Sequence, residues 1–254
     1  MSGAAPTVFE RTDARCGGAV LLHGIARTSG SMRKLERALQ VAGLATLNLD
    51  YASRKKPLEA LAADIHPAIA QFAAVIEGPL HFVGHSMGGL LTRVYIARYR
   101  PLRLGRVVML GTPNAGSEVA DVLQRWSVYR AFYGPAGLQL TSTPDRTLSS
   151  LPALDYSVGI VAGKRAIDPI SSLFILPRPN DGRVSVQSSR LEGMADHITI
   201  AATHTSLPRH PVAIGQTIAF LSEGRFSSSR CPKFGVHFSR GVDGRAKLRS
   251  ELFF

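Results

Sequence analysis

Short apolar runs alternate along the chain with longer segments in which apolar residues recur every three or four positions. The short runs have the length and composition of buried strands, and they cover residues 19–22, 45–49, 80–83, 106–110, 158–162 and 198–202. The longer segments have the period of helices with one apolar face, and they cover residues 31–42, 57–76, 87–100 and 211–221. This alternation predicts an α/β fold: a mostly parallel sheet of about six strands with helices on both faces.

The alternation is interrupted between residues 114 and 156, which contain the single tryptophan of the chain. The first part of this stretch has helical spacing, and a run rich in Gly, Pro, Ser and Thr follows it. We expect a small cap inserted between two strands. Its aromatic residues Trp126, Tyr129 and Phe132 are candidates for contact with a substrate, although packing of the cap onto the core accounts for them equally well.

The periodic pattern predicts one domain over residues 1–224, a length that buries a sizeable core. Residues 225–254 have no clear period and carry seven Lys or Arg residues against two acidic residues. We therefore expect a basic C-terminal tail outside the folded domain, with a composition compatible with disorder.

Composition and charge narrow the functional classes. Apolar residues make up 45% of the chain and charged residues 19%, which is typical of a soluble globular enzyme. The formal net charge is +12, but the basic residues are scattered and lack interleaved aromatic residues, so we expect no nucleic-acid partner. The charge is compatible with transient contact with an anionic membrane surface.

The chain shows no secretion signal and no apolar run of the roughly 18 residues that a membrane helix requires, so we expect a cytoplasmic protein. Its two cysteines, Cys16 and Cys231, fit no metal-binding spacing, and we expect no metal or other cofactor.

The most informative stretch is Gly84-His85-Ser86-Met87-Gly88, which has the form G-x-S-x-G. It follows a predicted strand and precedes a predicted helix, and in that setting a serine occupies a sharp, strained turn that exposes its hydroxyl. Ser86 is therefore the candidate nucleophile. Because a serine hydroxyl is a weak nucleophile at neutral pH, it requires a base and an acid that orients the base.

In this arrangement the acid and then the histidine follow the serine along the chain. His204 comes directly after the strand predicted at 198–202 and before the last helix, so we predict that it is the base; His210 is the alternative. We expect His197 at the opposite edge of the sheet, before that strand. Asp181, in an Asn-Asp-Gly turn, is the favoured acid, and Asp168 is its competitor.

An oxyanion that forms during acyl transfer needs preorganised donors. One should be the backbone N–H of Met87, the residue after the nucleophile. The second should come from the loop after the first core strand, where the sequence Leu22-His23-Gly24-Ile25 makes the N–H of Ile25 the candidate. We interpret His23 as a structural residue of that turn.

Five motifs occur in the order LLHGIART, VGHSMGGLLTR, GTPNAGSEVAD, NDGRVSV and THTSLPRHP. With them the chain resembles the α/β-hydrolase family over about residues 17–224, and within it bacterial lipases and related serine esterases. The resemblance implies Ser86, Asp181 and His204 as nucleophile, acid and base, Ile25 and Met87 as oxyanion donors, and a lid at residues 114–156.

The chain departs from the secreted lipases of that family at Ser206, where many of them carry a calcium-ligating Asp. The resemblance therefore implies a serine carboxylic-ester hydrolase, an esterase or lipase-like enzyme, acting on a small-molecule or lipid ester. A thioesterase or acyltransferase would use the same triad. The remaining alternative is a non-catalytic basic binding protein on the same scaffold, for which the net charge is the supporting observation.

Overall fold

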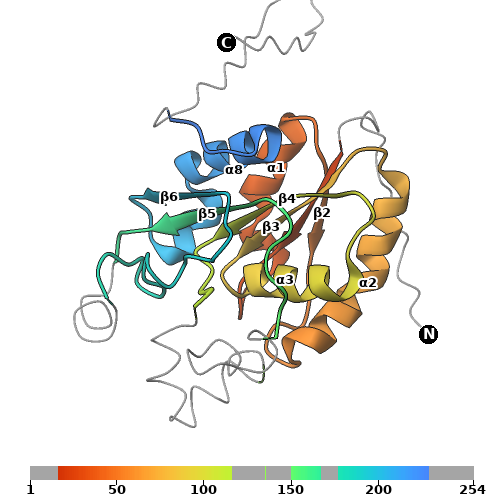
Figure 1. The fold of residues 1–254 in the computed structure, drawn as a ribbon, viewed down its shortest axis with the longest axis horizontal. Helices are drawn as coiled ribbons and strands as arrows, with labels where there is room; N and C mark the ends of the chain where they lie inside the picture. Colours follow the sequence, from red (N-terminus) through yellow and green to blue (C-terminus); the bar gives the residue numbers. More distant parts are fainter. Residues whose placement is uncertain (1–16, 116–134, 136–149, 167–176, 229–254) are drawn as a thin grey trace, which may run out of the picture.

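A computed structural model describes residues 17–115, 135, 150–166 and 177–228 of the 254-residue chain. Within these residues one six-stranded sheet has the order β2-β1-β3-β4-β5-β6, and every neighbouring pair is parallel (Figure 1). The strands are β1 (Gly18–Leu22), β2 (Ala45–Leu49), β3 (Leu80–His85), β4 (Leu104–Leu110), β5 (Val158–Gly163) and β6 (Asp196–Ile200). The predicted sheet is confirmed.

Helices cover both faces of the sheet, as the sequence predicts. One face carries α1 and α8, and the other carries α2 and α3 (Figure 1). The helices are α1 (Arg33–Val41), α2 (Leu58–Val75), α3 (Met87–Tyr99) and α8 (Pro211–Glu223), with the short 3₁₀ helices η1 (Ser29–Ser31) and η2 (His204–Arg209). All four predicted helices are present.

The largest error in the predicted boundaries concerns β6. The apolar pattern places this strand at 198–202, whereas the structure places it at Asp196–Ile200. β6 is one of the two edge strands of the sheet, and most of its residues are only half-buried, so polar side chains are tolerated at its start. An apolar run therefore marks the beginning of this strand poorly, and His197 belongs to the strand itself.

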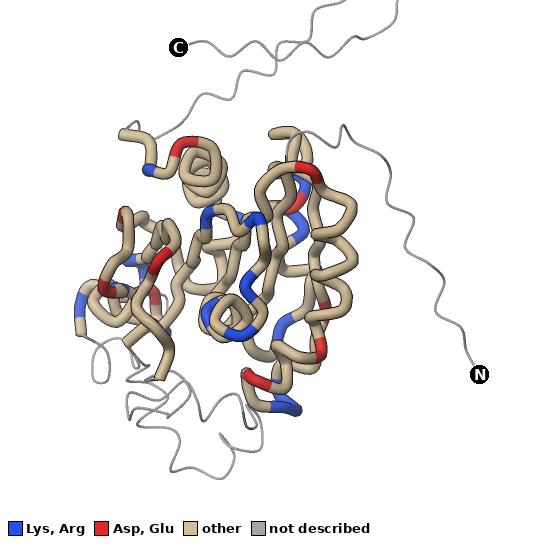
Figure 2. The backbone as a smooth tube through the Cα atoms, turned by 45° about the vertical axis from the view of Figure 1, so that its right-hand side comes forward, with Lys and Arg blue, Asp and Glu red and all other residues tan. Residues whose placement is uncertain are grey.

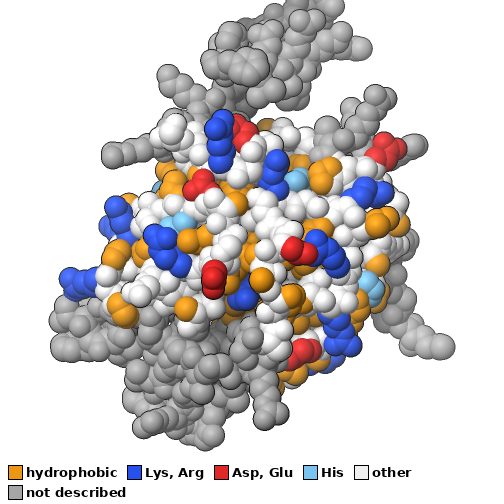
Figure 3. Space-filling view, viewed as in Figure 1, with side chains coloured by type: hydrophobic (Ala, Val, Ile, Leu, Met, Phe, Trp, Pro, Cys, Tyr) orange, Lys and Arg blue, Asp and Glu red, His pale blue; other side chains and the backbone are white. Residues whose placement is uncertain are grey.

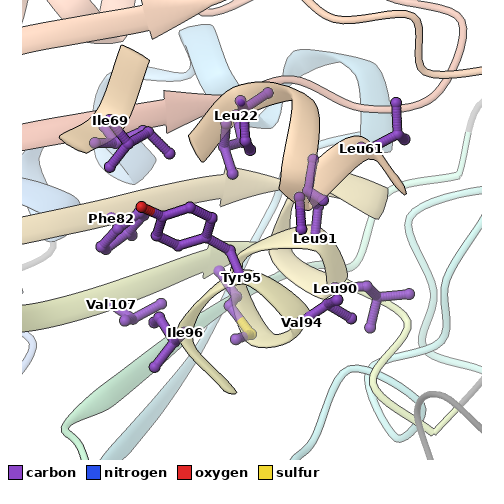
Figure 4. Close-up of a cluster of buried hydrophobic side chains, with 14 of the residues drawn as sticks. Leu22, Leu61, Ile69, Phe82, Leu90, Leu91, Val94, Tyr95, Ile96 and Val107 are labelled. Carbon is purple, nitrogen blue, oxygen red and sulfur yellow. The ribbon is translucent and has the colours of Figure 1, made fainter. Parts of the chain in front are cut away.

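The core lies on both faces of the sheet because side chains alternate along each strand. Val20 and Leu22 of β1 join the cluster under α2 and α3, whereas Ala19 and Leu21 join the cluster under α1 and α8. Figure 4 shows the first cluster around the fully buried ring of Tyr95, which packs on Phe82 and is surrounded by aliphatic side chains of α2, α3 and the central strands. This packing fixes α3, the helix that begins next to the candidate nucleophile.

Charged residues of both signs are distributed over the helices and loops of the described chain (Figure 2). On the face shown in Figure 3, Lys and Arg side chains stand apart from one another, with Asp and Glu between them. No described helix combines the length and the apolar composition that crossing a bilayer requires.

His81 on β3 makes the stability of the fold dependent on pH. Its Nδ1 accepts the backbone N–H of Arg106 at 2.9 Å, and burial, with the Arg106 guanidinium nearby, lowers its pKa to about 4. The unfolded chain takes up this proton near the ordinary pKa of about 6.5. The stabilising contribution is therefore complete above pH 6.5 and is lost as the pH falls to about 4.

We predict that His81→Asn weakens this acid sensitivity, because the carboxamide oxygen can accept the same N–H but does not titrate. Between pH 7 and pH 4.5, the wild type should lose about 2 to 3 kcal/mol more unfolding free energy than the variant. Urea unfolding at the two pH values measures the difference. The same pH dependence in both proteins would show that His81 is not responsible.

Candidate active site

The site lies where the order of strands reverses. The chain passes from β1 to β2 on one side and then returns to place β3 on the other side of β1. In open parallel sheets, the carboxyl ends of the strands at such a point form a crevice that loops can line. The predicted nucleophile follows β3, and the predicted oxyanion loop follows β1. The topology thus brings these two segments together.

Ser86 occupies the sharp turn between β3 and α3, with φ 55° and ψ −125°. A positive φ is strained for a residue with a side chain, and such strain persists only where the surroundings fix it. Here the N–H of Ser86 donates to the Leu110 carbonyl at 2.9 Å, and the Thr112 hydroxyl donates to the Ser86 carbonyl at 3.1 Å. The turn therefore has the conformation that the G-x-S-x-G pattern predicts.

Glycine at position 88 is required by a close approach of main chains. A Cβ atom there would lie 2.1 Å from the Leu22 carbonyl oxygen and 2.7 Å from that of His23. Both distances are far below van der Waals contact, so a larger residue would push α3 away from β1.

Ser86, His204 and Asp181 form a continuous chain of hydrogen bonds. His204 Nε2 lies 3.0 Å from Ser86 Oγ, and His204 Nδ1 lies 2.8 Å from Asp181 Oδ2. Because a carboxylate only accepts, Nδ1 carries the proton, and Nε2 is left to accept from the serine hydroxyl. All three residues are at least nine-tenths buried, so little water competes for these bonds.

The loop before β6 holds Asp181 in place. Its second carboxylate oxygen, Oδ1, accepts the backbone N–H groups of Val184 at 2.8 Å and Arg183 at 3.0 Å. Its own carbonyl accepts the backbone N–H of His204 at 3.0 Å. The acid and the base are thus fixed to each other through both main chain and side chain. Asp168, the competing acid, lies outside the described residues.

His85 contacts the main chain of His204, and the sequence pattern did not predict this contact. Its Nε2 donates to the carbonyl of His204 at 2.9 Å, and this fixes the proton on Nε2 because a carbonyl only accepts. Burial and the adjacent His204 hold the pKa of His85 well below its ordinary value. His85 is therefore a neutral support for the main chain of His204. The available sequence signal was its position directly before Ser86.

The two predicted oxyanion donors, the N–H groups of Ile25 and Met87, belong to a loop close to Ser86 and to the residue after it. Met87 is the first residue of α3, where a backbone N–H has no partner within the helix. The loop with Ile25 passes close by, since a Cβ on Gly24 would lie 3.2 Å from the Ser86 Cβ. The loop that contains Ile25 and the first residue of α3 therefore lie close to the serine, and the oxyanion role of their N–H groups stays a prediction.

The other histidines considered in the sequence analysis, His23, His197 and His210, do not take part in the chain of hydrogen bonds between Ser86, His204 and Asp181. His23 is buried in its turn, with Nδ1 donating to the Gly24 carbonyl at 2.8 Å. His197 contacts the Ser189 hydroxyl at 3.2 Å, and His210 precedes α8. The tentative substrate-contacting residues of the cap, Trp126, Tyr129 and Phe132, lie outside the described residues.

Within the part of the chain that the structure describes, no group of three or more His, Cys, Asp or Glu residues is arranged to hold a metal ion.

Comparison with known proteins agrees with the fold. Residues 20–152 match the model of the alpha/beta hydrolase fold family. A triacylglycerol lipase of Pseudarthrobacter phenanthrenivorans is 42% identical over 52 residues, which are 20% of this chain and 16% of that enzyme.

Two solved structures share the fold. The mature Bacillus licheniformis lipase BlEst2 aligns with a TM-score of 0.67 and 18% identity, covering 85% of this chain and 95% of that one. The metagenomic carboxyl esterase MGS0156 aligns with a TM-score of 0.62 and 20% identity, covering 79% and 68%. With the family match extending over more than half of the sequence, the chain belongs to the alpha/beta hydrolase fold family.

Proposed function

We propose that the protein is a serine hydrolase of carboxylic esters that acts through an acyl-enzyme. The observation that carries this proposal is the chain of hydrogen bonds from Ser86 through His204 to Asp181, at 3.0 and 2.8 Å, at the carboxyl edge of the sheet. The strained turn at Ser86 and the main-chain donors beside it are the other parts that acyl transfer requires.

In the first half-reaction, Ser86 Oγ attacks the ester carbonyl carbon and its proton passes to His204 Nε2. The carbonyl oxygen becomes an oxyanion that accepts hydrogen bonds from the N–H groups of Ile25 and Met87. Asp181 stabilises the imidazolium through Nδ1. The intermediate then collapses: the bond from carbon to the alcohol oxygen breaks, and the alcohol leaves with the proton from His204.

In the second half-reaction, water takes the place of the alcohol. His204 removes a proton from the water, whose oxygen attacks the acyl carbon of the Ser86 ester. The second intermediate expels Ser86 Oγ, which recovers its proton from His204, and the carboxylic acid is released. An acyl acceptor other than water would give transfer in place of hydrolysis, so the acceptor decides the reaction class.

The names of the similar proteins support an ester as substrate, since they are a triacylglycerol lipase, a lipase and a carboxyl esterase. A thioester would react through the same steps. Rates with a series of p-nitrophenyl esters of increasing acyl length, compared with acyl thioesters, would define the substrate.

Ser86→Ala should abolish ester hydrolysis and labelling by a fluorophosphonate probe, because the probe reacts with an activated serine hydroxyl. The residual rate is expected to be about a millionfold below that of the wild type. Ser222→Ala, at an exposed position near the end of α8, is the matched control and should react as the wild type does. Labelling of Ser86→Ala at the wild-type rate, or no labelling of the wild type, would contradict the proposal.

Asp181→Asn should lower kcat by about three to four orders of magnitude, while the folded structure is retained. The amide oxygen can still accept from the N–H groups of Arg183 and Val184, which directs the amide NH₂ toward His204. A donor there favours the tautomer with the proton on Nε2, which cannot accept from Ser86. Asp155→Asn, on the exposed pair with Arg100, should leave kcat unchanged. Steady-state kinetics with one ester distinguish the two variants, and an unimpaired Asp181→Asn would eliminate Asp181 as the acid.

A further inference from the structure

The loop after β1 is attached to the segment after β2 at three points. The Tyr51 hydroxyl donates to the His23 carbonyl. Ser53 Oγ accepts the backbone N–H of Ala26 at 3.1 Å. The Asp50 carboxylate accepts the N–H of Ser29 at 2.6 Å and the hydroxyl of Ser29 at 2.7 Å. Two of these contacts hold His23 and Ala26, the first and last residues of the turn that contains Ile25.

The attachment of His23 involves its ring as well as its main chain. The Tyr51 ring stacks on the imidazole with centroids 4.1 Å apart and planes 7° from parallel. Burial lowers the pKa of His23, so the imidazole is neutral at neutral pH. Its Nδ1 is occupied by the bond to the Gly24 carbonyl. Tyr51 thus fixes both the side chain and the carbonyl of the residue at which the turn begins.

The attachment at Ala26 opposes backbone strain. Ala26 has φ 56°, in the left-handed region that residues with a Cβ adopt at a cost of about 1 to 2 kcal/mol. Such a conformation persists only where neighbouring groups fix it. Ala26 is itself exposed, whereas the Ser53 side chain that holds its N–H is buried, with only 5% of its surface accessible. A buried side chain therefore holds an exposed residue in a strained conformation.

We propose that Tyr51 and Ser53 are positioning residues that hold the Ile25 N–H at the oxyanion. This inference rests on the proposed function, since it assigns to Ile25 the donor role described there. A donor must be in place before charge develops, because a loop that reorganises during the reaction loses most of the electrostatic stabilisation. The donor at Met87 is fixed by α3, whereas the donor at Ile25 lies on a loop and depends on these contacts.

The positioning role of Tyr51 and Ser53 predicts a specific effect on the kinetic constants. A bond to the oxyanion forms only in the transition state, so a displaced donor lowers kcat and leaves ground-state binding of the ester nearly unchanged. A general loss of folding would lower the amount of active enzyme without changing its inhibitor affinity. An inhibitor that places an oxygen in the oxyanion site therefore distinguishes the two explanations.

The experiment uses the full chain with Tyr51→Phe and Ser53→Ala. Each should lower kcat for a p-nitrophenyl ester about tenfold and change KM less than threefold. An alkylboronic acid forms a tetrahedral adduct when Ser86 Oγ bonds to boron and its proton passes to His204. The inhibition constant of this boronic acid should rise by the same factor as kcat/KM falls.

Tyr95→Phe and Thr217→Val are the matched controls. Each removes a buried hydroxyl that is hydrogen-bonded elsewhere in the core, Tyr95 to His66 and Thr217 to the Ala213 carbonyl. Both should retain wild-type kcat and boronic acid affinity, and thermal unfolding of all four variants verifies that they are folded.

Three results would overturn the positioning role of Tyr51 and Ser53. An active, fluorophosphonate-labelled wild type with wild-type kcat in both Tyr51→Phe and Ser53→Ala overturns the positioning role alone. A fall in kcat with unchanged boronic acid affinity also overturns it. A wild type that is neither active nor labelled overturns the proposed function, and the positioning role fails with it.

Discussion

The contact between the start of α3 and the end of β1 is the constraint on which the site depends. At Gly88 the helix lies so close to the Leu22 carbonyl that no side chain fits between them. Gly84 allows α3 to lie equally close to β3, since a Cβ at Gly84 would lie 2.5 Å from the Gly89 Cα. Because the two main chains touch, the turn that carries Ser86 and the loop that carries Ile25 become neighbours. The glycines of the motif thus set the distance between the candidate nucleophile and the loop donor.

Hydrogen-bond partners distinguish the three buried histidines near Ser86. The histidines on either side, His23 and His85, have pKa values lowered by burial, and each has one ring nitrogen occupied by a main-chain carbonyl. They serve as neutral parts of the structure. His204 differs from them because one of its nitrogens faces a carboxylate and the other a hydroxyl. This difference in partners, and not in residue type, separates the candidate base from its neighbours.

Periodicity was sufficient to predict the sheet, its helices and the edge at which the site forms. The G-x-S-x-G pattern and the order of acid and histidine along the chain indicated Ser86, Asp181 and His204, and the structure brings these three side chains into one chain of hydrogen bonds. Their catalytic roles stay predictions. The sequence favoured Asp181 over Asp168 without excluding Asp168, since an Asp-Gly turn is common and the path of a loop leaves no period.

What the sequence could not predict are contacts between loops. Tyr51 and Ser53 look like ordinary residues after a strand, and their meaning depends on the conformation of a turn more than 25 residues earlier. The bond from His85 to the carbonyl of His204 spans 119 positions. Such contacts depend on backbone angles, such as the positive φ of Ala26, that no local pattern of apolar and polar residues encodes.

The separation of the hydrogen-bonded groups along the chain has a consequence for biosynthesis. Ser86 and His204 are 118 positions apart, and Asp181 lies between them. At a synthesis rate of about 5 to 20 residues per second, the serine leaves the ribosome roughly 6 to 24 seconds before the histidine. On the proposed function, Ser86 has no base during that interval. The proposal therefore implies that Ser86 becomes reactive only after the segment that carries His204 has folded.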